Sequence, residues 1–123
     1  MDAFHEIKNV IMEILDVEED QILPETYLIR ELGAESIDLL ELAVSLNTVF
    51  KKEIIDDDIF LRKLRPYLDE AEEIGQDKSA YLAEKYSFLG HARIKEILGE
   101  LGGGPVLKVK DLVSYINYEK RKI

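Results

Sequence analysis

Residues 31–50, with the sequence ELGAESIDLLELAVSLNTVF, decide the fold of this chain. A turn at Gly33 and Ala34 leads to Ser36, a residue type that favours the N-cap of a helix. The pattern predicts a strongly apolar helix that begins at Ser36 and ends near Lys51 and Lys52, whose charges suit a helix C-terminus. The apolar residues of this segment are Ile37, Leu39, Leu40, Leu42, Ala43, Leu46, Val49 and Phe50.

The segment on the N-terminal side predicts one helix and one long loop. Apolar residues recur at helical spacing between Phe4 and Leu15, which predicts a helix from about 2 to 16 with Asp2 as its N-cap. Residues 16–31 contain Pro24 and an acidic cluster, so we expect a connecting loop. Four apolar residues are expected to pin this loop to the core: Ile22, Leu23, Tyr27 and Leu28.

The C-terminal side stays helical but is interrupted by turn residues. Apolar stripes predict helical segments over about 56–64, 67–74, 77–89, 94–101 and 110–122. Asp77 or Ser79 is expected to begin the third of these, and a glycine run at 102–104 with Pro105 ends the fourth. No stretch alternates as a strand would, so we predict an all-α helical bundle with one domain over 1–123.

Composition limits the functions that the chain can have. Its 123 residues are 46% hydrophobic and 34% charged, with a net charge of −10, which disfavours nucleic acid and anionic membrane surfaces as partners. Cysteine is absent, and no apolar run is long enough to span a membrane. We therefore expect a cytoplasmic, monomeric protein without a metal site. Residues 1–50 hold 12 acidic and two basic side chains, which form either a solvated face or a surface that attracts basic partners.

Ser36 is the candidate functional residue. A hydroxyl at the start of a helix lies beside unpaired backbone N–H groups and the positive end of the helix dipole, where a phosphate ester would be stabilised. On physical grounds alone, a simple capping role for Ser36 is the other interpretation.

The run Leu32-Gly33-Ala34-Glu35-Ser36-Ile37-Asp38, continued by Glu41, Leu42 and Phe50, resembles the attachment motif of acyl carrier proteins. The order of a first amphipathic helix, a long loop and a serine that opens a second helix is also similar. Residues 109–116 look like the last helix of that family. The resemblance covers roughly 1–60 and 106–120.

The resemblance implies that Ser36 receives 4'-phosphopantetheine from coenzyme A through a phosphopantetheinyl transferase. The terminal thiol of the arm would carry acyl groups as thioesters, and the protein itself would catalyse no reaction. Acyl-transferring, ligase or synthase enzymes with basic docking patches would be its further partners. The residues expected to contact partners are Glu35, Ile37, Asp38, Glu41 and Leu42.

The sequence departs from the family pattern in three places. Glu35 stands where aspartate is usual, and Asn47 and Thr48 replace acids that are common in fatty-acid carriers. Residues from about 62 to 104 have no counterpart in an ordinary carrier, so we expect a helical insertion between the short third helix and the last helix. The insertion would shelter an acyl chain, form a docking surface for a dedicated enzyme or have a purely structural role.

Two other functions remain open from the sequence. One keeps the arm and changes the cargo, as in a peptidyl, D-alanyl or polyketide carrier of a dedicated pathway. The other is an unmodified helical adaptor, in which Ser36 is only a cap and the acidic face binds a partner protein.

Overall fold

The protein is all-α, as predicted. The computed structural model describes residues 2–121, and within this range it contains no β-strand beyond one isolated bridge between Tyr27 and Lys108. Short 3-10 turns lie at Glu19–Gln21 and Leu101–Gly103. The α-helices are α1 (Ala3–Leu15), α2 (Ser36–Phe50), α3 (Asp56–Ile59), α4 (Leu64–Glu73), α5 (Lys78–Lys85), α6 (His91–Gly99) and α7 (Val109–Arg121). The predicted end of the last helix at Lys122 lies outside the described residues.

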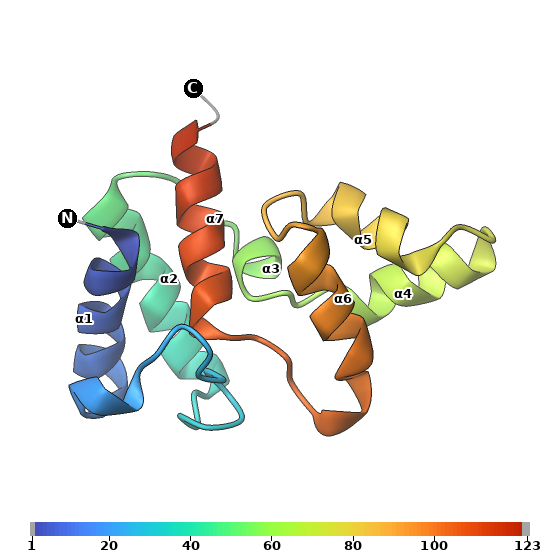
Figure 1. The fold of residues 1–123 in the computed structure, drawn as a ribbon. Helices are drawn as coiled ribbons and strands as arrows, with labels where there is room; N and C mark the ends of the chain where they lie inside the picture. Colours follow the sequence, from blue (N-terminus) through green and yellow to red (C-terminus); the bar gives the residue numbers. More distant parts are fainter. Residues whose placement is uncertain (1, 122–123) are drawn as a thin grey trace.

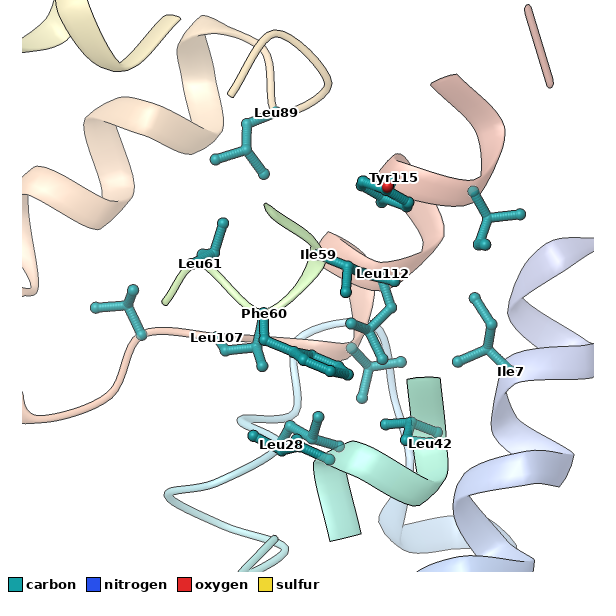
Figure 2. Packing of buried hydrophobic residues seen from close by; sticks show 14 of the residues in the cluster. Ile7, Leu28, Leu42, Ile59, Phe60, Leu61, Leu89, Leu107, Leu112 and Tyr115 are labelled. Atoms are coloured by element: carbon teal, nitrogen blue, oxygen red, sulfur yellow. The ribbon is translucent and has the colours of Figure 1, made fainter. Parts of the chain in front are cut away.

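The helices form two groups with α3 between them (Figure 1). Helix α1 packs against α2 and α7, while α4 packs against α5 and α5 against α6. One hydrophobic core runs through both groups. Figure 2 shows Ile7, Leu42 and Leu112 of the first group on one side of Phe60, with Leu89 on the other side.

Local capping residues explain where two of the helices begin. The Asp2 carboxylate accepts a hydrogen bond from His5 N at 2.8 Å, which confirms Asp2 as the N-cap of α1. At α5, the Asp77 carboxylate accepts from Ala80 N at 2.9 Å, so Asp77 rather than Ser79 is the N-cap. Ile74 was expected on the apolar stripe of α4 but is exposed, because the helix ends at Glu73.

The long loop between α1 and α2 is held by backbone pairing with a distant segment. Leu28 N donates to Leu107 O at 3.0 Å, and buried loop backbone needs such partners. Ile22 and Leu28 are buried, as predicted, and Tyr27 is partly buried. The prediction for Leu23 is wrong: its side chain is exposed, in a turn where Leu23 N donates to Thr26 Oγ1.

Two lysines fasten the same loop from the start of α7. The Glu25 carboxylate lies 2.8 Å from Lys108 Nζ and 2.9 Å from Lys110 Nζ. The hydrogen bonds from Lys108 and then Lys110 lower the pKa of Glu25 from 4.5 to about 2.

Glu25 is expected to make the fold more sensitive to acid. A carboxyl group whose pKa is lower in the folded protein stabilises it above pH 4.5, and this contribution is lost as the pH falls toward 2. Because the Glu25 side chain is 64% exposed, solvent screening keeps the effect small. The measurement is urea unfolding of wild type and Glu25→Gln, whose difference should shrink between pH 4.5 and 2. A difference that does not change with pH in that window would contradict the assignment.

A buried ion pair joins the two helix groups. Arg93 of α6 donates through Nε to Asp111 Oδ1 of α7 at 2.7 Å and through Nη2 to Asp111 Oδ2 at 2.9 Å. Arg93 Nη2 also reaches Val106 O at 2.6 Å, and Lys108 N donates to Asp111 Oδ2 at 2.9 Å. Burial opposes the charged guanidinium, but the hydrogen bonds and charge of Asp111 outweigh it, so the pKa of Arg93 is raised. The guanidinium of Arg93 therefore stays charged inside the protein.

Candidate functional site

Ser36 is the first residue of α2 and not its N-cap. The N-cap is Glu35, whose backbone N–H donates to Asp38 Oδ2 at 2.9 Å. The helix therefore begins at Ser36, as predicted, while the capping role belongs to Glu35, because the carboxylate of Asp38 accepts a hydrogen bond from the Glu35 N–H. Ser36 is exposed, and its hydroxyl makes no hydrogen bond within residues 2–121. The hydroxyl is thus available for modification.

The turn before Ser36 is built on one glycine and one small buried residue. Gly33 has φ +73°, a left-handed conformation that favours glycine, and its N–H donates to Ile29 O at 3.1 Å. Ala34 is buried, and its N–H donates to Leu28 O at 3.2 Å. These bonds set where the chain leaves the core, and so they position Ser36 at the surface.

Arg30 is a basic residue of this loop, and nothing in the sequence around it indicates its role. Its guanidinium lies 4.0 Å from the centre of the Tyr27 ring, and Nη2 donates to Gly104 O at 3.2 Å. Cation–π contact of this kind holds an arginine side chain in place. Spacing along the chain offers no signal for the contact, since Gly104 lies 74 residues away.

The exposed face of α2 carries apolar side chains around an acid. Ile37 is 60% exposed, Leu40 52% and Val44 61%, and Glu41 beside them is exposed as well. Leu40 and Val44 were not among the expected partner contacts, although they follow Ile37 at helical spacing. They extend the accessible surface by two turns.

The other expected partner residues lie in different environments. Glu35 is exposed and Asp38 is partly buried, so both carboxylates reach the surface beside Ser36. Leu42 is only 3% exposed and packs in the core, so its side chain is not accessible to a partner. We assign Leu42 to the core.

The start of α2 fits a phosphodiester. The first backbone N–H groups of a helix have no intrahelical acceptor, and the dipole favours negative charge there. A Cβ built on Gly33 would meet no heavy atom within 4 Å, so the surface beside the serine is open. Among the described residues, no group of three or more His, Asp or Glu side chains is arranged to hold a metal ion. No helix of residues 2–121 is long and apolar enough to cross a membrane.

The N-terminal half of the chain matches carriers of a covalently attached group. Residues 5–63 match the family model described as "Phosphopantetheine attachment site". The acyl carrier protein of Campylobacter lari is 41% identical over 58 residues, which cover 47% of this chain and 75% of that protein. The acyl carrier protein of Helicobacter hepaticus is 38% identical over 58 residues, which cover 47% and 76%.

The chain belongs to the acyl carrier protein family, whose prosthetic group is 4'-phosphopantetheine. This confirms the family and the cofactor that the motif predicted. No solved structure matches the chain. The family match ends at residue 63, in the loop just before α4.

Proposed function

We propose that Ser36 is the attachment residue and that the protein carries acyl groups as thioesters for fatty-acid or specialised lipid biosynthesis. The observation that supports this most directly is the exposed Ser36 hydroxyl, which the capping bond between Glu35 and Asp38 leaves unused. In the modification, Ser36 Oγ forms a bond to the phosphorus of coenzyme A that bears the pantetheine. The bond from that phosphorus to adenosine 3',5'-bisphosphate breaks, and the hydroxyl proton passes to the transferase.

The protein acts as a tether in this proposal. It contains no cysteine, so the thiol that bears the acyl group comes from the arm. Attachment raises the effective concentration of the acyl group at the active site of each docked enzyme. The role of this chain's residues is to hold the arm, to meet each enzyme and to shield the cargo.

The test is the intact mass after incubation with coenzyme A and a broad-specificity phosphopantetheinyl transferase. A gain of one phosphopantetheinyl group supports a carrier. No gain, with a folded protein and a working control carrier, would favour the unmodified adaptor. Subsequent charging with fatty acyl, aminoacyl and polyketide donors would separate an acyl carrier from peptidyl, D-alanyl or polyketide carriers.

The exposed face of α2 is the proposed docking surface for the transferase and the acyl-transferring enzymes. It presents the acids Glu35, Asp38 and Glu41 beside the apolar side chain of Ile37. Basic patches on the enzymes would be attracted to the acids, and charge attraction of this kind raises association rates.

Glu41→Lys is expected to slow transfer to Ser36, with a larger effect at low salt than at high salt. Glu41 is exposed and makes no ion pair within the described residues, so its replacement leaves the fold intact. The measurement is the transferase kcat/KM over a range of salt concentrations. Glu72→Lys makes the same charge change at an exposed residue of α4 and is the matched control. It should have only a weak effect on the transferase kcat/KM. Equal slowing by both variants would contradict a local docking role.

We also propose that the chain is a single carrier domain with a helical insertion over about 62–104. Three observations support it: the family match ends at residue 63, α7 packs back on α1, and one core joins the insertion to the rest.

A further inference from the structure

Residues 101–106 form a connecting segment between α6 and α7, and arginine side chains bind three of its backbone carbonyls. In Figure 1 it belongs to the orange loop that leads from α6 back to α7. Arg65 of α4 donates through Nη2 to Leu101 O at 2.7 Å, and Arg93 of α6 donates through Nη2 to Val106 O at 2.6 Å. Both ends of the connecting segment are therefore fixed to helices of the proposed insertion.

The third arginine, Arg30, comes from the loop that precedes Ser36. Its Nη2 donates to Gly104 O at 3.2 Å, and its guanidinium lies 4.0 Å from the centre of the Tyr27 ring. A planar guanidinium can stack on a ring and donate hydrogen bonds in its own plane at the same time, which the point charge of a lysine cannot do. Arg30 thus joins the loop before Ser36 to a segment that the proposed insertion holds.

The connecting segment comes close to Arg30 because residue 103 is a glycine. A Cβ added to Gly103 would lie 3.4 Å from Arg30 Nη1 and Nη2, so an alanine would just fit and a larger side chain would displace the guanidinium. A Cβ added to the adjacent Gly102 would meet no heavy atom within 4 Å. The glycine run, which was predicted to end a helix, therefore also admits the contact with Arg30.

Hydrogen bonds within the loop link the arginine contact to the turn before Ser36. Glu31 N donates to Tyr27 O at 3.1 Å, and the Glu31 carboxylate accepts from Tyr27 N at 2.8 Å. Ala34 N, two residues before Ser36, donates to Leu28 O at 3.2 Å. The residues on both sides of the arginine are thus bonded to each other, so a displacement of its side chain would also shift the serine.

We propose that the helices of residues 62–104 brace the turn that bears Ser36 through the connecting segment, and that Arg30 is a positioning residue for attachment of the phosphopantetheinyl arm. This inference rests on the proposed function, because it needs Ser36 as the attachment residue. The step concerned is attack of Ser36 Oγ on the phosphorus of coenzyme A, which releases adenosine 3',5'-bisphosphate and passes the hydroxyl proton to the transferase. A hydroxyl that is held in one orientation reaches the phosphorus more readily than one on a loose turn.

The expected kinetic signature of this role is a loss in kcat with little change in KM. In the proposed function the transferase docks on the exposed face of α2, and neither Arg30 nor Gly103 lies on that helix. A looser turn should therefore leave docking unchanged and slow the chemical step. The measurement is kcat and KM for transfer from coenzyme A to the full chain by a broad-specificity phosphopantetheinyl transferase.

The experiment compares Gly103→Val with Gly102→Val, the same substitution one residue away. Gly103→Val should lower kcat about tenfold, since a misplacement of about 1 Å can cost about 100-fold. Gly102→Val should match wild type, because its side chain would point into open space. Circular dichroism and thermal unfolding of each variant show whether the fold is intact.

Two variants of Arg30 test the same contact from its other side, and they decide if Gly103→Val does not fold. Arg30 is exposed, so its replacement leaves no buried cavity. Arg30→Ala should lower kcat as Gly103→Val does. Arg30→Lys should not restore it, because lysine keeps the charge and loses the planar contact with Tyr27.

Wild-type kcat in both Gly103→Val and Arg30→Ala would overturn the inference. Restored transfer in Arg30→Lys, or a change confined to KM, would overturn it as well. Either result would show that the charge of Arg30 contacts the transferase directly.

Ser36→Ala, measured beside these variants, separates the inference from the proposed function. Modification of Ser36→Ala would refute the proposed function, and the inference with it. If Ser36→Ala stays unmodified while Gly103→Val and Arg30→Ala react with wild-type kcat, the inference alone is refuted and the carrier function stands.

Discussion

Ser36→Ala is expected to abolish phosphopantetheinylation while the fold stays intact. The substitution removes the one hydroxyl of the motif, and no other serine or threonine lies between residues 27 and 44. Loss of an N-cap costs about 0.5–2 kcal/mol, but Glu35 and Asp38 cap α2, so the stability loss should fall below that range. Intact mass after treatment with transferase and coenzyme A measures modification, and circular dichroism measures helix content.

Ser79→Ala is the matched control for this result. Ser79 is the second residue of α5, whose N-cap is Asp77, so it also lies at a helix start, but in the proposed insertion. This variant should be modified as fully as wild type. Modification of Ser36→Ala, or its loss in Ser79→Ala, would show that the arm attaches elsewhere.

Asp111→Asn is expected to destabilise the protein by about 3–5 kcal/mol, because it removes the buried counter-charge of Arg93 and leaves this cation only the half-exposed carboxylate of Glu96 at 3.2 Å. Arg93 is 6% exposed and Asp111 fully buried, so water cannot replace the missing partner. Small domains have about 5–15 kcal/mol of stability in total, so the loss is a large share. Urea unfolding followed by circular dichroism gives the free energy.

Two further measurements show whether the ion pair causes the loss. The double variant Arg93→Met/Asp111→Asn should lose less stability than the two single changes together, because no uncompensated charge remains. Asp57→Asn breaks an ion pair to Lys63 whose side chains are about half exposed, and it should cost less than about 1 kcal/mol. If the stability losses of the two single variants add up in the double variant, the ion pair is not their cause. The same holds if Asp57→Asn loses as much stability as Asp111→Asn.

Asp111 lies on α7 beside α1, while Arg93 lies in the proposed insertion, so the ion pair links these two parts of the chain.

Local sequence signals were sufficient to predict the order and the type of the secondary-structure elements. Asp2 and Asp77 begin their helices because a short acidic side chain reaches the backbone N–H three residues later. The glycine turn at Gly33 and the family motif also depend on adjacent residues alone, so they are readable from one stretch. The all-α class, the carrier family and its prosthetic group follow from these signals.

The buried face of α2 could not be predicted from spacing. Its sequence is apolar on several sides, so periodicity does not separate Leu42, which is buried, from Leu40, which is exposed. The N-cap of α2 is similarly ambiguous from the sequence, because Ser36 and Glu35 are both candidates for it. The bond from Glu35 N to Asp38 decided it and left the Ser36 hydroxyl unused.

The sequence by itself determined the helices, the family and the candidate serine, since each depends on residues within a few positions of one another. Tertiary structure alone decided the pairing of Arg93 with Asp111, the contact of Arg30 with Gly104, and the pocket between residues 60–65 and 104–107. These join residues that are 18, 74 and at least 39 positions apart. The physical reason is packing: helix packing brings distant segments together, and a buried charge such as Arg93 must find its partner among the residues packed around it.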